Sequence, residues 1–351
     1  MIRVLIDTDA PYEALVGRGL LAGLGALIAR VHAPSKAAVI TDRTVSALYG
    51  QKALQALEQA GFSPSLFEFP AGEEYKTLST YADAQAFLIG MGLTRSDIVV
   101  TMGGGVAGDL GGFAAATYQR GVPFIQVPTT LLCAVDASVG GKTAVDMPGG
   151  KNMVGAFHQP SLVVCDTDTF SSLPENRLAD GAAEALKHGL IADEALFDRM
   201  RDGGWHDDME AIVARNIEIK RSFVVGDEKD RGMRQMLNFG HTLGHAVETL
   251  SGYALSHGQA VALGMVMETR AANRMGFGCA DEEKIARALE KNGLTVSCGF
   301  SVDDVLKTAL RDKKRAGDQV VVAALEKIGK GKLKALPLSE FERYVRLGVE
   351  A

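Results

Sequence analysis

Short apolar runs typical of β-strands recur along the first half of the chain. These runs lie at residues 3–6, 14–16, 37–40, 66–69, 98–102, 124–127 and 162–165. Helical stretches separate several of them, at about residues 19–30, 43–60, 77–91 and 106–118. Strands that alternate with helices indicate βαβ units and a mostly parallel sheet. Ligands of such sheets bind beyond the carboxyl ends of the strands.

The pattern changes near residue 173, where helical periodicity replaces the strand-type runs. Helices are predicted at residues 174–191, 196–200, 209–225, 233–250, 258–275, 281–293 and 302–317. Residues 318–338 look like a small hairpin that turns at Gly329–Gly331, and a last helix is predicted near residues 340–347. We therefore expect a Rossmann-like α/β domain at residues 1–172 and a mainly helical domain at residues 173–351, with the active site in the cleft between them.

Composition narrows the class of protein. Apolar residues make up 47% of the 351-residue chain, which is normal for a globular protein, and the net charge of −6 with no basic block argues against nucleic-acid binding. The chain has no apolar run long enough to span a bilayer, and its N-terminus lacks the features of a signal peptide. The four scattered cysteines, Cys133, Cys165, Cys279 and Cys298, are typical of buried thiols in a reducing cytoplasm.

A glycine-rich turn follows the predicted strand at residues 98–102. Its sequence, GGGVAGDLGGFAAATY, runs directly into a predicted helix. Uncovered backbone N–H groups and the helix dipole make such a turn an anion site, and its place after a central strand favours a dinucleotide pyrophosphate. A tight strand-to-helix turn without a ligand is the alternative. Asp42, at the end of another strand, suits either an adenosine ribose or a helix cap.

Residues 120–160 combine positive charge with glycine and apolar residues. Arg120, Lys142, Lys151, Asn152 and His158 lie in this segment. Cations in glycine-rich apolar loops suit a phosphate or a carboxylate, whereas surface loops with extended lysines are the alternative. Two threonines after the strand at 124–127, Thr129 and Thr130, suit either a helix cap or a cofactor contact.

Three of the seven histidines fall within residues 232–258. His241 and His245 are one helical turn apart, and His257 follows a glycine-containing break. Glu184 lies in a small, apolar helix and needs a partner. Glu184 with two histidines would form a catalytic metal site with open coordination positions. Spacing alone leaves the ligand set open, because His188 would also face Glu184, and buried core histidines are the alternative.

Together these motifs are highly specific. The chain resembles the 3-dehydroquinate synthase family almost end to end. The resemblance is carried by AGEEYK (71–76), GGGVAGDLGGF (103–113), QRGVPFIQVPTTLLCAVDASVGGKTAVD (119–146), GKNMVGAFHQP (150–160), GAAEALKHG (181–189), NFGHTLGHAVE (238–248) and SHGQAVALGM (256–265). It implies the fold of that family, which is related to the architecture of glycerol dehydrogenase.

The resemblance also implies the metal site. Zinc or cobalt would bind to Glu184, His241 and His257, so that His245 handles protons and His188 has no assigned role. The helix at residues 233–250 would then carry Arg234, Asn238, His241 and His245 along one face.

The remaining site residues implied by the resemblance bind NAD and the substrate. The NAD-binding positions are Asp42, Gly72, Glu73, Glu74, Tyr75, Lys76, Gly105, Val106, Ala107, Gly108, Asp109, Thr129, Thr130, Lys142, Lys151, Thr169, Phe170, Ser171 and Ser172. The substrate-binding and catalytic positions are His245, Asp136, Lys142, Lys151, Asn152, Lys187, Lys220, Arg234, Asn238 and Arg120. Arg120 would reach the substrate phosphate of the neighbouring subunit in a homodimer, and Lys313 or Lys314 would also reach a phosphate.

The activity implied is the conversion of 3-deoxy-D-arabino-heptulosonate 7-phosphate to 3-dehydroquinate and phosphate in the cytoplasm. Transient oxidation by NAD, phosphate elimination, reduction, ring opening and an intramolecular aldol step would follow one another at one site. The alternatives are another sugar phosphate cyclase and a metal-dependent polyol dehydrogenase. Lys142, Thr143 and Asp146, with residues 150–160, match the dehydroquinate branch better.

Overall fold

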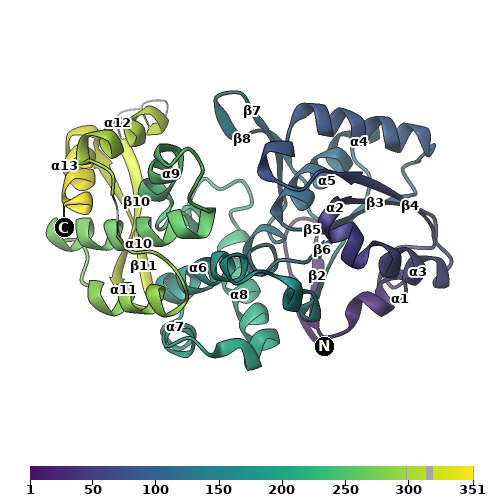
Figure 1. Ribbon diagram of the computed structural model, residues 1–351, viewed down its shortest axis with the longest axis horizontal. Coiled ribbons are helices and arrows are strands. Elements are labelled where there is room, and N and C mark those ends of the chain that lie inside the picture. Colours follow the sequence, from purple (N-terminus) through teal and green to yellow (C-terminus); the bar gives the residue numbers. More distant parts are fainter. Residues whose placement is uncertain (298, 314–318, 351) are drawn as a thin grey trace. The chain divides into compact units, whose positions relative to one another are not determined.

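The chain folds into two compact units. The computed structural model describes residues 1–297, 299–313 and 319–350. One unit comprises Met1–Leu173 and Val224–Lys229, and the other comprises Pro174–Phe223 and Asp230–Ala351 (Figure 1). The return of the short segment Val224–Lys229 to the first unit has no counterpart in the apolar pattern of the sequence.

The first unit is built on a seven-stranded sheet with the order β1-β2-β9-β6-β5-β3-β4. Its strands are β1 (Ile2–Ile6), β2 (Tyr12–Gly17), β3 (Lys36–Asp42), β4 (Ser63–Phe69), β5 (Ile98–Gly103), β6 (Phe124–Pro128) and β9 (Leu162–Asp166). Every pairing is parallel except that of β1 with β2. The mostly parallel sheet and the seven strands predicted from the apolar runs are therefore confirmed.

Helices cover both faces of this sheet. Alternate residues of its strands therefore pack into two separate hydrophobic cores, one on each face. On β3, Ala37 and Val39 belong to one core and Ala38 and Ile40 to the other. The helices of this unit are η1 (Leu20–Gly23), α1 (Leu24–Ile28), α2 (Arg43–Val45), η2 (Ser46–Gly50), α3 (Gln51–Gln59), η3 (Glu73–Tyr75), α4 (Leu78–Gly90), α5 (Gly105–Thr117), η4 (Tyr118–Arg120), η5 (Cys133–Ala137) and η6 (Thr167–Ser172). A sheet buried on both faces reads as continuous apolar strands, as the sequence does here.

A hairpin within the cationic segment was not predicted. Strands β7 (Lys142–Met147) and β8 (Gly150–Phe157) pair in antiparallel register and form a separate two-stranded sheet. The sequence showed glycine-rich loops here, because β8 has no buried residue and contains two glycines, Gly150 and Gly155. The hairpin places Lys151 and Asn152 on a strand rather than in a loop.

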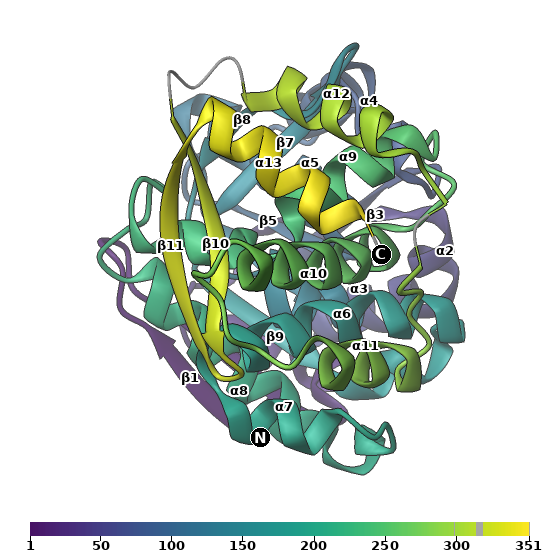
Figure 2. The ribbon, with the colours of Figure 1, turned by 90° about the vertical axis from the view of Figure 1, so that its left-hand side faces the viewer.

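The second unit is mainly helical, as predicted. It contains α6 (Glu175–Ala192), α7 (Glu194–Met200), η7 (Trp205–Asp208), most of α8 (Met209–Val224), η8 (Met233–Asn238), α9 (His241–Leu250), α10 (His257–Arg274), α11 (Glu282–Lys291), α12 (Val302–Lys313) and α13 (Leu338–Val349). The predicted hairpin is present as β10 (Gln319–Lys327) and β11 (Lys330–Pro337). The central helix α10 packs against α6, α9 and α13 (Figure 2).

The prediction of one continuous helix at residues 233–250 is wrong. The 3-10 helix η8 ends at Asn238, and Gly240 adopts a left-handed conformation with φ +80° before α9 begins at His241. Arg234 and Asn238 therefore lie on a different element from His241 and His245, and the four residues do not share one helical face.

Two further sequence expectations concern the thiols and membrane spans. Cys133 and Cys165 are buried as expected, but Cys279 is exposed, which contradicts its assignment as a buried thiol. Cys298 lies outside the described residues. Among the described helices, none is long and apolar enough to cross a membrane.

Glycines bring the backbones of α9 and α10 into direct contact. A Cβ atom at Gly264 of α10 would lie 1.8 Å from the carbonyl oxygen of Gly240 and 2.7 Å from the amide nitrogen of Gly244. A Cβ atom at Gly244 would lie 2.8 Å from the carbonyl oxygen of Ala260. Since His241 begins α9 and His257 begins α10, this close packing fixes how near the two histidines approach.

We predict that Gly264→Ala destabilises the protein. The added methyl group must push α9 away from α10, and overpacking of this kind costs about 1–3 kcal/mol. Gly90→Ala, at the end of α4, is the matched control because nothing lies within 4 Å of its added Cβ atom. Thermal unfolding should show a lower transition temperature for Gly264→Ala and no loss for Gly90→Ala. Equal stability of Gly264→Ala and wild type would contradict the packing described here.

Candidate active site

The carboxyl ends of β3, β5 and β6 bring the glycine turn together with Asp42 and two threonines. These strands are neighbours in the sheet. The Thr129 amide donates to the Gly103 carbonyl over 2.9 Å, and a Cβ atom at Gly104 would lie 3.2 Å from Thr130 Cγ2. A Cβ atom at Gly103, where φ is +153°, would lie 3.6 Å from Asp42 Oδ2. This is the edge where ligands of parallel sheets bind.

The N-terminus of α5 at this edge has the features of an anion site. Gly104 is the N-cap and supplies no side-chain oxygen to the first amides of the helix. These amides and the positive end of the helix dipole suit a phosphate group. Thr129 Oγ1 is buried and has no hydrogen-bond partner among the described residues. An unsatisfied buried hydroxyl beside a glycine turn fits a bound polar ligand.

Asp42 takes one of the two roles that the sequence left open. Its carboxylate accepts hydrogen bonds from the amides of Thr44 and Val45 over 2.9 and 3.0 Å, so it caps the helix that follows β3. The second carboxylate oxygen, Oδ2, is the one that faces Gly103. Capping and a ribose contact are therefore compatible at this residue.

The segment Thr169–Ser172 lies in η6, directly after β9. The Tyr49 hydroxyl contacts it twice, donating to the Thr169 carbonyl over 3.1 Å and to Ser172 Oγ over 2.8 Å. Phe170 is buried, whereas Ser171 and Ser172 are exposed. The structure thus anchors this predicted segment to η2, which follows the helix that Asp42 caps.

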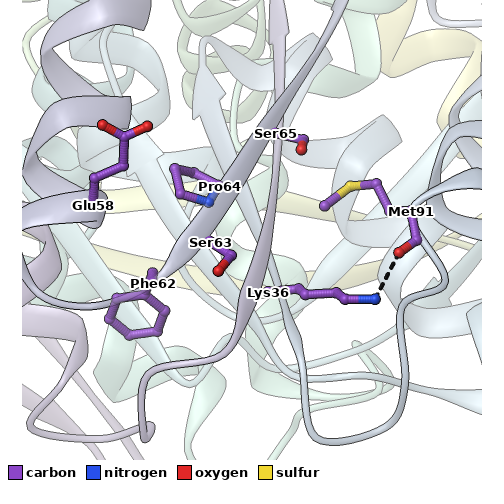
Figure 3. Close-up of a pocket in the computed structure, with 7 residues that line it drawn as sticks. All are labelled: Lys36, Glu58, Phe62, Ser63, Pro64, Ser65 and Met91. Atoms are coloured by element: carbon purple, nitrogen blue, oxygen red, sulfur yellow. Dashed lines mark hydrogen bonds between the residues drawn. The ribbon is translucent and has the colours of Figure 1, made fainter.

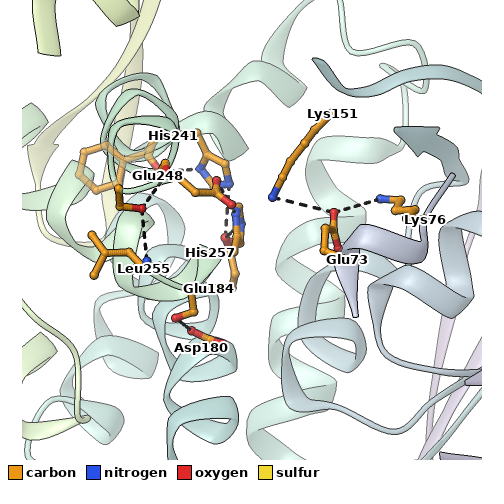
Figure 4. A network of polar contacts seen from close by, with 12 residues as sticks. Glu73, Lys76, Lys151, Asp180, Glu184, His241, Glu248, Leu255 and His257 are labelled. Atoms are coloured by element: carbon orange, nitrogen blue, oxygen red, sulfur yellow. Dashed lines mark hydrogen bonds and ion pairs between the residues drawn. The ribbon is translucent and has the colours of Figure 1, made fainter. Parts of the chain in front are cut away.

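A buried ammonium group joins three of the predicted segments. Lys76 is 3% exposed, and its Nζ lies 2.6 Å from Asp109 Oδ2 and 2.5 Å from Asn152 Oδ1. Glu73 Oε1 lies 3.9 Å from Lys76 Nζ and 4.0 Å from Lys151 Nζ (Figure 4). Burial alone would lower the pKa of Lys76, but the charges of Asp109 and Glu73 outweigh it and raise the pKa. Lys76 therefore stays charged and ties α5 to the β7–β8 hairpin.

Two hollows lie on the first unit, and they differ in their relation to these residues. One, of about 390 Å³, is lined by Glu73, Glu74 and Asp146 beside the predicted cofactor segment. The other, of about 400 Å³, is lined by Lys36, Ser63 and Met91, and the Lys36 ammonium donates to the Met91 carbonyl (Figure 3). Lys36 and Ser63 begin β3 and β4, so this hollow lies at the amino ends of the strands.

The other predicted residues of the first unit lie in or next to the cationic segment. Asp136 lies in η5, Lys142 begins β7, and Arg120 ends η4. Gln119 and Arg120 both have positive φ, +48° and +68°, and this is uncommon for residues other than glycine. His158 stacks on Phe124, and its Nε2 lies 2.9 Å from the Val122 carbonyl, so it has a structural contact.

In the second unit, two imidazoles converge on one carboxylate oxygen. Glu184 Oε1 lies 3.3 Å from His241 Nε2 and 3.2 Å from His257 Nε2 (Figure 4). Asp180, one turn before Glu184 on α6, accepts a hydrogen bond from the Ser256 hydroxyl at the start of α10. A Cβ atom at Gly258 would lie 2.4 Å from Asp180 Cα, so glycine lets α10 begin directly against α6. This contact brings His257 to Glu184.

The protonation of this group follows from its burial and charges. Burial alone would raise the pKa of Glu184, but Lys187 and His241 hold it well below its usual range. Burial lowers the pKa of His241. For His257, the contacts with the carboxylates of Glu184 and Glu248 outweigh burial and raise the pKa to about 10. Without a metal, His257 therefore carries a proton that a bound cation would have to displace.

This donor set fits a metal of the zinc type. His241 Nδ1 lies 3.2 Å from the Phe239 carbonyl, which can only accept, so Nδ1 carries the hydrogen. The Nε2 lone pair of a neutral His241 then faces an oxygen of the Glu184 carboxylate, an arrangement that a cation between them stabilises. One ligand atom from each of Glu184, His241 and His257 lies within 4.8 Å of the other two. Two imidazoles and a carboxylate form a familiar catalytic zinc set.

The remaining predicted residues of the second unit lie around this group or on separate elements. Lys187, on α6, is almost fully buried and pairs with Glu184. His245 is exposed on α9, and its ring centroid lies 5.2 Å from that of His241. Lys220 is on α8, while Arg234 and Asn238 belong to η8; Lys220 and Arg234 are buried.

His188, which has no assigned role, contacts Asn216. Its Nδ1 lies 2.9 Å from Asn216 Oδ1, and the side-chain Nδ2 of Asn216 donates to the Ile212 carbonyl. Lys313 ends α12, and its side chain is not described. Lys314 lies outside the described residues.

The sequence reasoning missed two buried carboxylates beside the metal group. Glu248 Oε2 lies 3.8 Å from His257 Nδ1, and Glu268 accepts hydrogen bonds from the amides that begin α9. The signal that singled out Glu184, a carboxylate in an apolar helix, was also present at both positions.

The fold belongs to a class that includes sugar phosphate cyclases and also glycerol and iron-containing alcohol dehydrogenases. A solved 2-deoxy-scyllo-inosose synthase, complexed with carbaglucose-6-phosphate, NAD⁺ and Co²⁺, matches with a TM-score of 0.88 and 27% identity over 98% of this chain and 99% of that one. The 2-epi-5-epi-valiolone synthase of Streptomyces hygroscopicus subsp. jinggangensis 5008, with NAD⁺ and Zn²⁺ bound, matches with a TM-score of 0.86 and 25% identity over 97% of each chain. A probable glycerol dehydrogenase from Sinorhizobium meliloti 1021 shares the fold alone, with a TM-score of 0.64 and 17% identity over 96% of each chain.

Sequence relatives define the family within this class. Residues 66–180 match the model of the 3-dehydroquinate synthase N-terminal domain, and residues 181–315 match that of its C-terminal domain. The 3-dehydroquinate synthase of Streptococcus suis (strain 05ZYH33) is 42% identical over 347 residues, which cover 97% of this chain and 98% of the relative. The chain belongs to the 3-dehydroquinate synthase family, and it is an enzyme.

Proposed function

We propose that this protein converts 3-deoxy-D-arabino-heptulosonate 7-phosphate to 3-dehydroquinate and phosphate, a step of aromatic amino acid biosynthesis. The observation that carries the proposal is the convergence of His241 and His257 on Glu184 in a chain of this family. The reaction makes no net change in oxidation state, so the cofactor must be returned to its starting form in each turnover.

The second unit holds the metal in this proposal. Glu184, His241 and His257 would bind Zn²⁺ or Co²⁺, which suits their nitrogen and oxygen donors and agrees with the metals named for the two solved synthases. The metal, when bound, supplies Lewis-acid polarisation of substrate hydroxyl groups. Lys187 offsets the buried negative charge of Glu184, and the exposed imidazole of His245 handles protons.

The first unit holds NAD in this proposal. NAD supplies a reversible hydride acceptor. The first amides of α5, at Gly105–Asp109, bind its pyrophosphate, and Asp42 accepts from its ribose. Thr129 and Thr130 contact the cofactor at the same sheet edge, with Gly72–Lys76 and Thr169–Ser172 to either side in sequence. The unsatisfied hydroxyl of Thr129 and the glycines at 103–105 support this assignment.

The charged residues are assigned to the two anionic groups of the substrate. Lys142 and Arg234 suit its carboxylate, and Lys151, Asn152 and Arg120 suit its phosphate. Asp136, Lys187, Lys220 and Asn238 complete the polar contacts. The hydrogen bond between Lys76 and Asn152 and the short turn at Met147–Gly150 hold the β8 residues in place.

A cytoplasmic homodimer completes the proposal, with Arg120 contributed to the partner's site. The positive φ of Gln119 and Arg120 supports a presented side chain here, because backbone strain of this kind persists where surrounding structure enforces it. The side-chain amide of Gln119 donates from Nε2 to the Leu93 carbonyl, and Arg95 Nε donates to the backbone carbonyl of Gln119, and these two bonds hold the turn.

The second candidate is another cyclase of the same superfamily, which the high TM-scores of the inosose and valiolone synthases favour. Sequence separates the candidates, because identity to those two enzymes is 27% and 25%, against 42% to the dehydroquinate synthase. We therefore retain the dehydroquinate synthase activity as the conclusion.

We predict that purified protein, given the heptulosonate phosphate, Zn²⁺ and a catalytic amount of NAD⁺, releases phosphate in step with a product that a dehydroquinate dehydratase consumes. NADH should not accumulate, because each hydride returns to the same substrate molecule. Stoichiometric NADH would indicate a dehydrogenase instead. Inertness toward this substrate, with turnover of glucose 6-phosphate or sedoheptulose 7-phosphate, would identify another cyclase.

We predict that His241→Ala and His257→Ala lose bound zinc, whereas His245→Ala retains it and turns over more slowly. The geometry supports this difference, since the first two imidazoles meet Glu184 and His245 is exposed. General acid–base groups contribute about 10²–10⁴-fold to the rate, which sets the expected loss for His245→Ala. Metal analysis of the three purified variants decides the assignment. Loss of zinc from His245→Ala with retention in His257→Ala would reverse it.

A further inference from the structure

Two buried carboxylates of the second unit contact either a histidine of the metal group or the backbone beside one, without belonging to the assigned ligand set. Glu248, on α9, is 6% exposed, and Glu268, on α10, is fully buried. A buried carboxylate is costly unless charge or hydrogen bonds compensate for it. The contacts that compensate each of these groups therefore indicate what it does in the fold.

Glu248 faces the far side of the His257 imidazole. Its Oε2 lies 3.8 Å from His257 Nδ1, while His257 Nε2 points to Glu184 Oε1 (Figure 4). The ring thus stands between two carboxylates, and an Nδ1–H directed at Glu248 leaves Nε2 for a metal. Carboxylates in this position orient metal-binding histidines and fix their tautomer.

The backbone of Glu248 is held by the turn that leads to His257. Its carbonyl accepts hydrogen bonds from Ser251 Oγ over 2.7 Å and from the Tyr253 amide over 3.1 Å. Ser251 Oγ in turn accepts from the Leu255 amide over 3.2 Å. The position of the carboxylate is therefore set by the same short loop that carries His257.

Glu268 faces the start of α9. Its two oxygens accept from the amides of Gly240 and Leu243 over 2.9 and 3.0 Å. The first amides of a helix have no partner within the helix, and Gly240 has no side chain to cap them. A carboxylate from α10 therefore replaces the missing cap, and His241 lies between the two amides that it binds.

The two contacts are reciprocal. Helix α9 carries Glu248, which faces the histidine of α10, and α10 carries Glu268, which holds the turn bearing the histidine of α9. The backbone contact at Gly244 and Gly264 allows both carboxylates to reach across. Neither interaction is visible from spacing within one helix, because each joins residues of different helices.

We propose that Glu248 and Glu268 are positioning residues that set the metal affinity of the Glu184, His241 and His257 group by holding the two imidazoles from opposite helices. The inference rests on the proposed metal site and goes beyond its ligands. Glu248 acts on the ring of His257, whereas Glu268 acts on the backbone that presents His241. Their substitutions should therefore differ in what they change.

The test is a titration of Co²⁺ into chelator-treated apoprotein. Visible absorption monitors the binding, and metal analysis gives the amount of cobalt bound. We expect Glu248→Ala to bind cobalt about 10–100-fold more weakly than wild type, the range found when such outer carboxylates are removed. Glu248→Gln should lose less, because its amide oxygen still accepts from Nδ1–H. Both should shift the visible spectrum of the bound cobalt.

Glu268→Gln tests whether the carboxylate of Glu268 positions His241. Its amide group offers only one acceptor to the two N–H groups, so we expect both a lower thermal transition of the apoprotein and weaker cobalt binding. Glu290→Gln, an exposed position on α11, removes the same charge and should change neither quantity. If Glu268→Gln fails to fold, the Glu248 series still decides the proposal.

Three outcomes would overturn the inference, and they are distinguishable. Wild-type cobalt affinity and spectrum in Glu248→Ala would show that the carboxylate does not position His257. Two cobalt ions in wild type and one in Glu248→Ala would make Glu248 a ligand of a second site, since His245, Glu248 and His257 also offer ligand atoms within 4.8 Å of one another. A wild-type protein that binds no cobalt would instead remove the metal site of the proposed function, and the inference with it.

Discussion

The buried carboxylate of Glu184 is the constraint on which the second unit depends. Glu184 is fully buried, and an ionised carboxylate in such surroundings is stable only when cationic and hydrogen-bonding groups surround it. Lys187 from the same helix, His241 from α9 and His257 from α10 provide these groups. Three helices must therefore meet at one oxygen atom, and the rest of the unit is arranged so that they can.

Small residues make this meeting possible. Gly258 lets α10 begin against Asp180 of α6, and Gly264 lets α9 and α10 touch through their backbones. Glycines also allow close packing in the first unit. A Cβ atom at Gly111 would lie 2.6 Å from Thr101 Cγ2, and one at Gly112 would lie 2.6 Å from Thr143 Cγ2. The high glycine content of the chain, 40 residues, thus partly reflects close packing at functional groups as well as turns.

Much of the architecture was predictable, because doubly buried strands leave continuous apolar runs and long amphipathic helices leave periodic ones. The β7–β8 hairpin was not predictable in this way, since its second strand has no buried residue and contains two glycines. The break before His241 was also missed. It depends on the left-handed conformation of Gly240 and on a cap supplied by Glu268, 28 residues later in the chain. Local sequence does not reveal a cap that comes from another helix.

The candidate site was predictable in its residues more than in its geometry. Spacing left four histidines to compete for Glu184, and the resemblance to a family selected His241 and His257. The structure brings the Nε2 atoms of these two to Glu184, while His188 contacts Asn216. The roles of Glu248 and Glu268 were not predicted, because a carboxylate in an apolar helix indicates that it has a partner but does not identify that partner. Only the packing of α9 against α10 identifies these partners.

The most direct test of the account is anomalous diffraction at the zinc absorption edge from crystals grown with zinc. We predict a single peak about 2.0–2.2 Å from Glu184 Oε1, His241 Nε2 and His257 Nε2, the distances that zinc adopts with oxygen and nitrogen ligands. A peak at His245 and Glu248 instead, with no metal at Glu184, would contradict the central claim that Glu184 gathers the metal ligands of this protein.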